Sequence, residues 1–338
     1  MPEKRLSDKL REFLLQAQGK EVDLDYLRKE LQIDPNSPAW NGIRQQMVNL
    51  TAEKIVKPSG RKDGIYKVIS QVTPVKVYSV LRQRRPPLEL KFPIDFTTGM
   101  ELSFAEAIVI REGDLITIGG VKSTGKTQLS LAFCAANIDA NPVLMGSEYT
   151  IMSEGVYEPA PRFLERLDRM SQWVTWVNES GEDKFTLLPV RDDFAEHVIP
   201  NRLNIADWIN LDASALYDIG KVLGAFKAAV GRGIGIAVLQ KGEGALNPRG
   251  GQFVRDFSDV EILLDPFGNN PHDVLLTIKG VKESIKSVVG KTYAYTIGEG
   301  GTKIFNFREV KKCPGCGGSR FQKGHDCDTC FGTGFVDK

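Results

Sequence analysis

The sequence of 338 residues lacks a hydrophobic run long enough to cross a membrane, which takes roughly 18 consecutive apolar residues. Its first segment, MPEKRLSDKL, also lacks the apolar core of a secretory signal peptide. Cysteine is scarce, and four of the five cysteines lie between Cys313 and Cys330, which favours a metal site over a disulfide framework. We therefore expect an intracellular protein of a reducing compartment, with no membrane partner.

Net charge is almost absent as well, because 44 Lys and Arg residues face 43 Asp and Glu residues. The charges are unevenly distributed. Residues 1–95 carry 18 basic and 12 acidic side chains, residues 96–307 carry 20 and 27, and residues 308–338 carry 6 and 4. Two basic ends around an acidic middle indicate a nucleic-acid partner, and a simple solvated surface is the alternative.

Residues 1–71 show helices and strands in a recognisable order. Leucines recur at helical spacing in residues 6–14 and 24–31, and Ser37 followed by Pro38 is typical of a helix start. Two short strands are expected at residues 54–57 and 64–69. This order resembles a winged helix–turn–helix domain. The resemblance implies DNA contacts from the third helix and the wing, with a protein-docking role as the alternative; the candidate contacts are Arg44, Gln45, Lys57, Arg61 and Lys62.

Residues 72–95 are expected to form a linker between domains. They contain four prolines, which stiffen a connecting segment, and three closely spaced arginines.

The most specific motif begins at the end of the apolar strand 115–120. There, GVKSTGKT fits the pattern G-x-x-x-x-G-K-T, and a helix is expected directly after it. In such a P-loop, backbone N–H groups and the helix N-terminus surround phosphate groups. The lysine reaches the β- and γ-phosphates, and the hydroxyl of the next residue binds Mg²⁺. The predicted nucleotide site comprises Gly120, Val121, Lys122, Ser123, Thr124, Gly125, Lys126, Thr127 and Gln128, with Mg²⁺ on Thr127.

Four further motifs follow the P-loop in the chain. Glu148 ends the next apolar strand, Asp207 lies within LNIADWINL, and Gln240 ends the apolar run GIGIAVLQ. Lys279 and Lys282 end the run VLLTIKGVK. Together with the P-loop, this order resembles the RecA/DnaB-type ATPases over residues 96–307.

The resemblance implies an α/β core with a mostly parallel sheet, and ATP as the nucleotide. Glu148 would polarise the attacking water, Asp207 would hold Mg²⁺, and Gln240 would sense the γ-phosphate. A loop that follows Gln240 would face DNA, with Lys241, Arg249 and Arg255 as contacts. Lys279 and Lys282 would reach the ATP of a neighbouring copy in a ring or filament, although lysine cannot make the planar two-point grip of arginine. A surface glutamate, a capping glutamine and a solvated loop are the structural alternatives.

Two C-x-x-C sequences, at Cys313–Cys316 and Cys327–Cys330, end the chain. Four thiolates suit a tetrahedral Zn²⁺ and leave no open position for catalysis. The second sequence continues as C-x-x-C-x-G-x-G, which resembles a zinc-binding repeat of DnaJ-type chaperones. We therefore predict a structural zinc module at residues 308–338, with His325 as an alternative ligand. Whether the module binds DNA, a protein or nothing further stays open.

These observations combine into an expectation of three domains: a winged helix, a RecA-like ATPase core and a zinc module. The favoured function is an ATP-hydrolysing motor or remodeller that acts on DNA in replication, recombination or repair. One alternative is an ATP-switched DNA-binding mediator, loader or regulator that does not unwind DNA. A weaker alternative is a regulatory, kinase-like ATPase of the clock-protein type.

Overall fold

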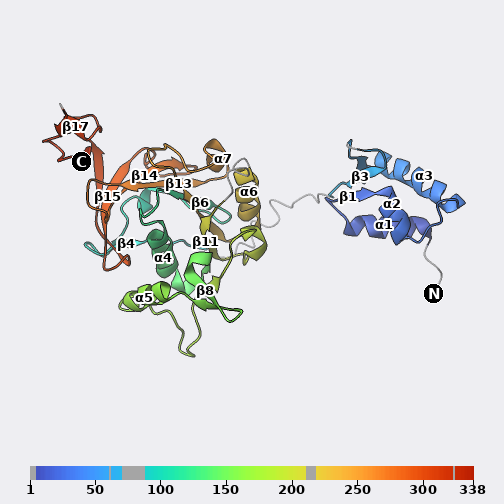
Figure 1. The fold of residues 1–338 in the computed structure, drawn as a ribbon, viewed down its shortest axis with the longest axis horizontal. Coiled ribbons are helices and arrows are strands. Elements are labelled where there is room, and N and C mark those ends of the chain that lie inside the picture. The colour runs from blue at the N-terminus through green and yellow to red at the C-terminus, as the bar shows by residue number, and fades with distance from the viewer. Residues whose placement is uncertain (1–4, 61, 71–87, 211–217, 323) are drawn as a thin grey trace. The chain divides into compact units, whose positions relative to one another are not determined.

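The structure is a computed structural model that describes residues 5–60, 62–70, 88–210, 218–322 and 324–338. The chain divides into two compact units, Met1–Arg85 and Pro86–Lys338, each of which is described by itself (Figure 1). No helix among the described residues is long and apolar enough to cross a membrane.

The first unit contains three helices and a three-stranded antiparallel sheet. Its elements are α1 (Leu6–Gln16), β1 (Glu21–Asp23), α2 (Leu24–Glu30), α3 (Pro38–Ala52), β2 (Val56–Pro58) and β3 (Ile65–Val68). The leucines at helical spacing meet in one core with α3. In the sheet, β3 lies between β1 and β2. The two expected strands are present, and β1 was not expected because its three residues are too few for a periodic pattern.

The second unit is built on a twelve-stranded sheet in which six neighbouring strands are parallel. These are β10 (Thr186–Leu188), β7 (Val143–Met145), β11 (Leu203–Ile209), β12 (Ile234–Gln240), β6 (Leu115–Gly120) and β13 (Val260–Pro266), in spatial order. Their sequences are nearly continuous apolar runs, as expected for strands buried on both faces.

Antiparallel strands extend this sheet beyond β13. They are β14 (Asp273–Val281), β15 (Thr292–Gly298) and β16 (Lys303–Lys312), followed by β4 (Ile94–Asp95), β5 (Met100–Glu101) and β19 (Phe335–Asp337). β4 runs parallel to β16, and β19 pairs with β16 antiparallel. Two short hairpins lie apart from the sheet: β8 (Thr150–Ser153) with β9 (Val156–Pro159), and β17 (Phe321–Gln322) with β18 (His325–Asp326).

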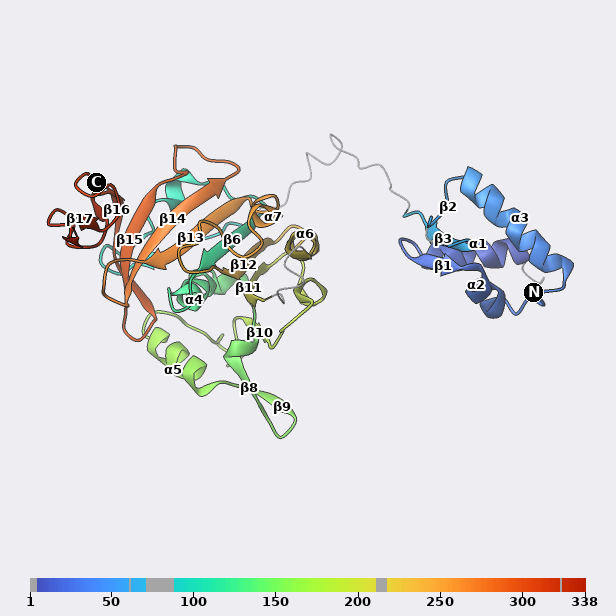
Figure 2. The ribbon, with the colours of Figure 1, turned by 45° about the horizontal axis from the view of Figure 1, so that its top comes forward.

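Helices cover both faces of the parallel strands (Figure 2). α4 (Lys126–Ala136) packs on the face that carries Ile116, Ile118 and Ile205. α6 (Ile219–Ala229) packs on the opposite face against Leu115 and Ala206. The alternation follows from the two-residue period of a strand. The remaining helices are α5 (Pro161–Met170) and the short α7 (Gln252–Arg255).

Both boundaries of the large domain differ in the structure from those that we expected from the sequence. Residues 88–95, which we expected in the linker, belong to the second unit: Phe92 is buried against Phe104 and Phe133, and β4 pairs with β16. Residues 71–87 lie outside the described residues. The zinc module does not begin a separate unit at residue 308, because β16 runs through that position and β19 returns to pair with it. A sequence pattern could not reveal either pairing, since both join segments far apart in the chain.

A substitution of Phe104 tests the packing of the core of the second unit. Its ring is 1% exposed and contacts Phe92, Tyr293 and Phe307 at centroid distances of 5.5, 5.5 and 5.8 Å. Replacing it with alanine leaves a cavity, so we expect Phe104→Ala to lower the free energy of unfolding by about 3–5 kcal/mol in urea denaturation. Met100→Ala is the control, because Met100 is 66% exposed. Equal effects of the two substitutions would contradict this packing.

Candidate nucleotide and metal sites

The P-loop lies at the carboxyl edge of the parallel strands. β6 ends at Gly120 between β12 and β13, and α4 begins at Lys126. Gly125 has φ = 81°, in the left-handed region, and a Cβ there would overlap the side chain of Ile297. Glycine is therefore required where the loop turns into the helix.

Lys126 folds back across this loop. Its Nζ donates to the carbonyl oxygens of Gly120 at 3.0 Å and Val121 at 2.7 Å. Burial lowers the pKa of Lys126, while the charges of Asp207 and Glu148 act to raise it. The ammonium is thus partly desolvated and held near two carboxylates.

Asp207 of β11 is 2% exposed and lies beside the P-loop helix. Its Oδ2 accepts a hydrogen bond from the Tyr149 hydroxyl, and the nearby Thr127 hydroxyl favours the charged form of the carboxylate. Oδ1 has no hydrogen-bond partner among the described residues. Burial raises the pKa of Asp207 to about 6, against the opposing effects of Tyr149, Thr127 and Lys126. A buried carboxylate with an unused oxygen is a site that a cation would stabilise.

Glu148 approaches the same strand from the turn Ser147–Tyr149. Its Oε1 accepts a hydrogen bond of 3.0 Å from Nε1 of Trp208. Two consecutive residues of the turn therefore contact two consecutive residues of β11, since Tyr149 bonds Asp207. Gly146 permits this approach, because a Cβ there would overlap the Asp207 carbonyl oxygen.

The structure thus brings Lys126, Thr127, Glu148 and Asp207 together from three segments of the chain. The sequence analysis did not identify Tyr149 and Trp208 as contacts. The only available signal was their position directly after the two predicted carboxylates, and an aromatic residue there is equally common in a core.

The segment after Gln240 differs from what we expected. Gln240 ends β12 in register with Gly120, next to the P-loop. Lys241 is only 4% exposed and forms an ion pair with Asp265, so the prediction that it contacts nucleic acid is wrong. Arg255 bonds the buried Glu261 at 3.3 Å, which occupies part of its guanidinium. Arg249 is exposed and stays a candidate contact.

Lys279 and Lys282 lie far from the P-loop of their own chain. β14 runs antiparallel to β13, so its C-terminal end lies at the opposite edge of the sheet. Lys282 bonds Oδ1 of the buried Asp259 at 2.9 Å, and this hydrogen bond raises the pKa of Lys282. Any contact of these lysines with a nucleotide must therefore involve another copy.

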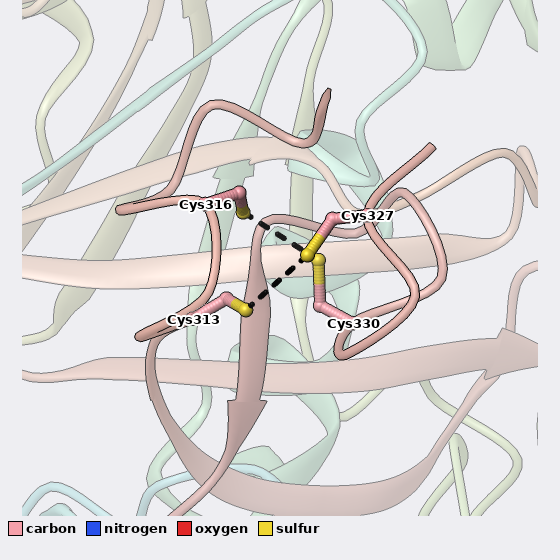
Figure 3. A group of neighbouring side chains, drawn as sticks. All are labelled: Cys313, Cys316, Cys327 and Cys330. Carbon is pink, nitrogen blue, oxygen red and sulfur yellow. Dashed lines mark hydrogen bonds between the residues drawn. The ribbon is translucent and has the colours of Figure 1, made fainter. Parts of the chain in front are cut away.

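The four cysteines of the C-terminal module converge (Figure 3). All four sulfur atoms lie within 4.8 Å of one another. The Sγ–Sγ distances are 3.8 Å for Cys313–Cys327 and 3.7 Å for Cys316–Cys330. A tetrahedron with Zn–S bonds of about 2.3 Å has edges of about 3.8 Å, so the donor set fits Zn²⁺. His325 is exposed and is not part of the cluster.

Backbone groups support these thiols. The N–H of Gly334 donates to Sγ of Cys330 at 3.3 Å. Burial acts to raise the pKa of Cys316. The backbone N–H groups of Gly318 and Arg320 act in the opposite direction, and the pKa falls to about 6. N–H donors stabilise thiolate, the form that binds metal.

We expect the purified protein to contain one zinc per chain by elemental analysis. Cys330→Ser should remove most of this zinc and unfold the module, because three sulfurs bind the ion far less tightly. Cys134→Ser is the control, since Cys134 is buried in the core and lies outside the cluster. Full zinc content in Cys330→Ser would show that the ion does not use this site.

No family model matches the chain, and no curated protein matches it. Among solved structures, it resembles a KaiC-like protein from the hyperthermophilic archaeon Pyrococcus horikoshii OT3, with 17% identity and a TM-score of 0.43. The likeness covers 65% of this chain and 100% of the other.

Proposed function

We propose that this protein is an ATPase of the RecA-like type that hydrolyses ATP at the P-loop and acts on DNA. The observation that carries the proposal is the meeting of Lys126, Thr127, Glu148 and Asp207 at one edge of the parallel sheet. Open α/β sheets bind their ligands at this edge.

Mg²⁺ fits the residues present. Asp207 offers an unpartnered buried oxygen, and the Thr127 hydroxyl lies against the same carboxylate. Mg²⁺ prefers oxygen ligands of this kind. When bound, the ion would neutralise charge on the β- and γ-phosphates.

Each side chain has a separate task in hydrolysis. Lys126 exchanges its loop carbonyls for phosphate oxygens and stabilises the charge that develops on them. Glu148 accepts a hydrogen bond from the attacking water and orients it toward the γ-phosphate. Tyr149 and Trp208 hold the two carboxylates in place. Gln240, next to Gly120, would report the state of the γ-phosphate to the segment that follows it.

The first unit supports a DNA partner. Its order of three helices and three strands resembles that of a winged helix, and α3 exposes Arg44 and Gln45. The Arg44 guanidinium lies over the Trp40 ring at 5.4 Å, which restrains it. Lys57 on β2 and Lys62 in the turn between β2 and β3 are also exposed. Arg61 lies outside the described residues. This surface has the basic and polar side chains that duplex recognition needs.

A ring or filament would place Lys279 and Lys282 near a neighbour's nucleotide. The ion pair of Lys282 with Asp259 favours a second candidate function, an ATP switch without strand separation, because that lysine is already engaged. Unwinding of a forked duplex that depends on ATP would identify the motor, and DNA binding without unwinding would identify the switch.

We expect Lys126→Ala to lower ATP turnover by about 10²–10³-fold, because it removes the phosphate-binding cation. Glu148→Gln should lower turnover similarly and leave ATP affinity nearly unchanged, since glutamine cannot polarise the water. Phosphate release and equilibrium binding of ATP separate the two effects. Lys221→Ala, which removes an exposed lysine of α6, is the control. Full turnover in Lys126→Ala would refute the proposed site.

We expect Arg44→Ala and Lys62→Ala to weaken binding of a labelled DNA duplex in fluorescence anisotropy. Each lost phosphate contact should reduce the slope of log K against log salt by about 1. Lys29→Ala, an exposed lysine of α2, is the control. A slope that stays constant in both variants would assign the first unit to protein docking.

A further inference from the structure

A cavity of about 200 Å³ lies along α4 in the second unit. Gln128, Ala132 and Ala136 of α4 line one side, and Phe96, Trp173 and Ile304 line the other. Phe96 and Trp173 contact each other edge to face, with ring centroids 4.9 Å apart. The cavity therefore has aromatic and aliphatic walls and one amide at the end nearest the P-loop.

Gln128 is the unusual member of this lining. It is 5% exposed, and neither its amide oxygen nor its amide nitrogen has a hydrogen-bond partner among the described residues. The indole N–H of Trp173 is also unpartnered. Buried polar groups are rarely left without a partner, because each such group costs folding free energy. Three unused donors and acceptors around one cavity indicate that a polar ligand completes them.

The position of Gln128 limits what this ligand is. The residue directly follows Thr127 in the first turn of α4, so its side chain leaves the helix beside the predicted phosphate position. The cavity is smaller than the roughly 300 Å³ of a typical small-molecule pocket, which leaves room for a ring system and not for a whole nucleotide.

The chemistry of the amide selects among ring systems. A glutamine amide offers one donor and one acceptor side by side, which matches the N6 and N7 groups of adenine. The corresponding edge of guanine presents two acceptors, O6 and N7, and would leave the amide oxygen unpaired. We infer that this cavity binds the base of the nucleotide and that Gln128 determines a preference for adenine. The inference rests on the proposed function, since it assigns the base of the nucleotide bound at the P-loop.

The test measures binding of Mg-ATP, Mg-GTP and Mg-tripolyphosphate by titration calorimetry. Wild-type protein should bind ATP at least about tenfold more tightly than GTP and tripolyphosphate. Gln128→Leu, which keeps the size of the side chain, should weaken ATP binding about 5- to 100-fold and abolish the preference over GTP. Gln172→Leu is the matched control, because Gln172 is exposed next to Trp173. Equal preference for ATP in wild type and Gln128→Leu would overturn the inference.

A second measurement does not depend on how Gln128→Leu folds. Trp173 lines the cavity, so in a Trp208→Phe background, which removes the indole bonded to Glu148, its fluorescence should change when ATP binds and should not change with tripolyphosphate. Trp173→Phe should lose this response, and Trp40→Phe in the first unit should retain it. A response to ATP that persists in Trp173→Phe would place the base elsewhere, with water as the occupant of the cavity. If tripolyphosphate binds and ATP binds no better, the inference alone fails; if neither binds, the proposed function fails with it.

Discussion

The buried carboxylate of Asp207 organises the candidate site. It lies in a region where burial disfavours its charged form, and it is nevertheless surrounded by donors from two other segments: the Thr127 hydroxyl of α4 and the Tyr149 hydroxyl of the turn after β7. These contacts fix three neighbouring parts of the sheet edge relative to one another. Burying this carboxylate costs folding free energy, and the apolar packing of the surrounding strands offsets that cost.

The antiparallel strands that extend the sheet beyond β13 also contact the P-loop edge of the sheet. β15 brings Ile297 against Gly125, and β16 and β4 form the wall opposite α4 that holds Phe96 and Ile304. The antiparallel half therefore covers the helix that begins at the P-loop. It also carries the zinc module, because β19 pairs with the last residues of β16. The four cysteines are thus joined by a continuous strand to the segment that lines the cavity.

The two segments in which we expected basic side chains to contact DNA differ in kind. The first unit has its own core and exposes Arg44, Lys57 and Lys62, which the proposed DNA contact requires. The residues after Gln240, which the sequence marked as a basic DNA-facing loop, are partly neutralised by Asp265 and Glu261. The acidic partners of Lys241 and Arg255 come from β13. A local sequence pattern does not predict that β13 lies beside these two residues.

Residue order alone was sufficient for the P-loop, the two cysteine pairs and the three helices of the first unit, because each depends on local spacing along the chain. The boundaries of the second unit, the burial of Lys241 and the position of Lys282 depend on pairing between distant strands, and local sequence contains no record of it. The same holds for the hydrogen bonds that join Tyr149 to Asp207 and Trp208 to Glu148. Only folding of the sheet brings these side chains within bonding distance, and only then does Gln128 become an unpartnered amide beside a cavity.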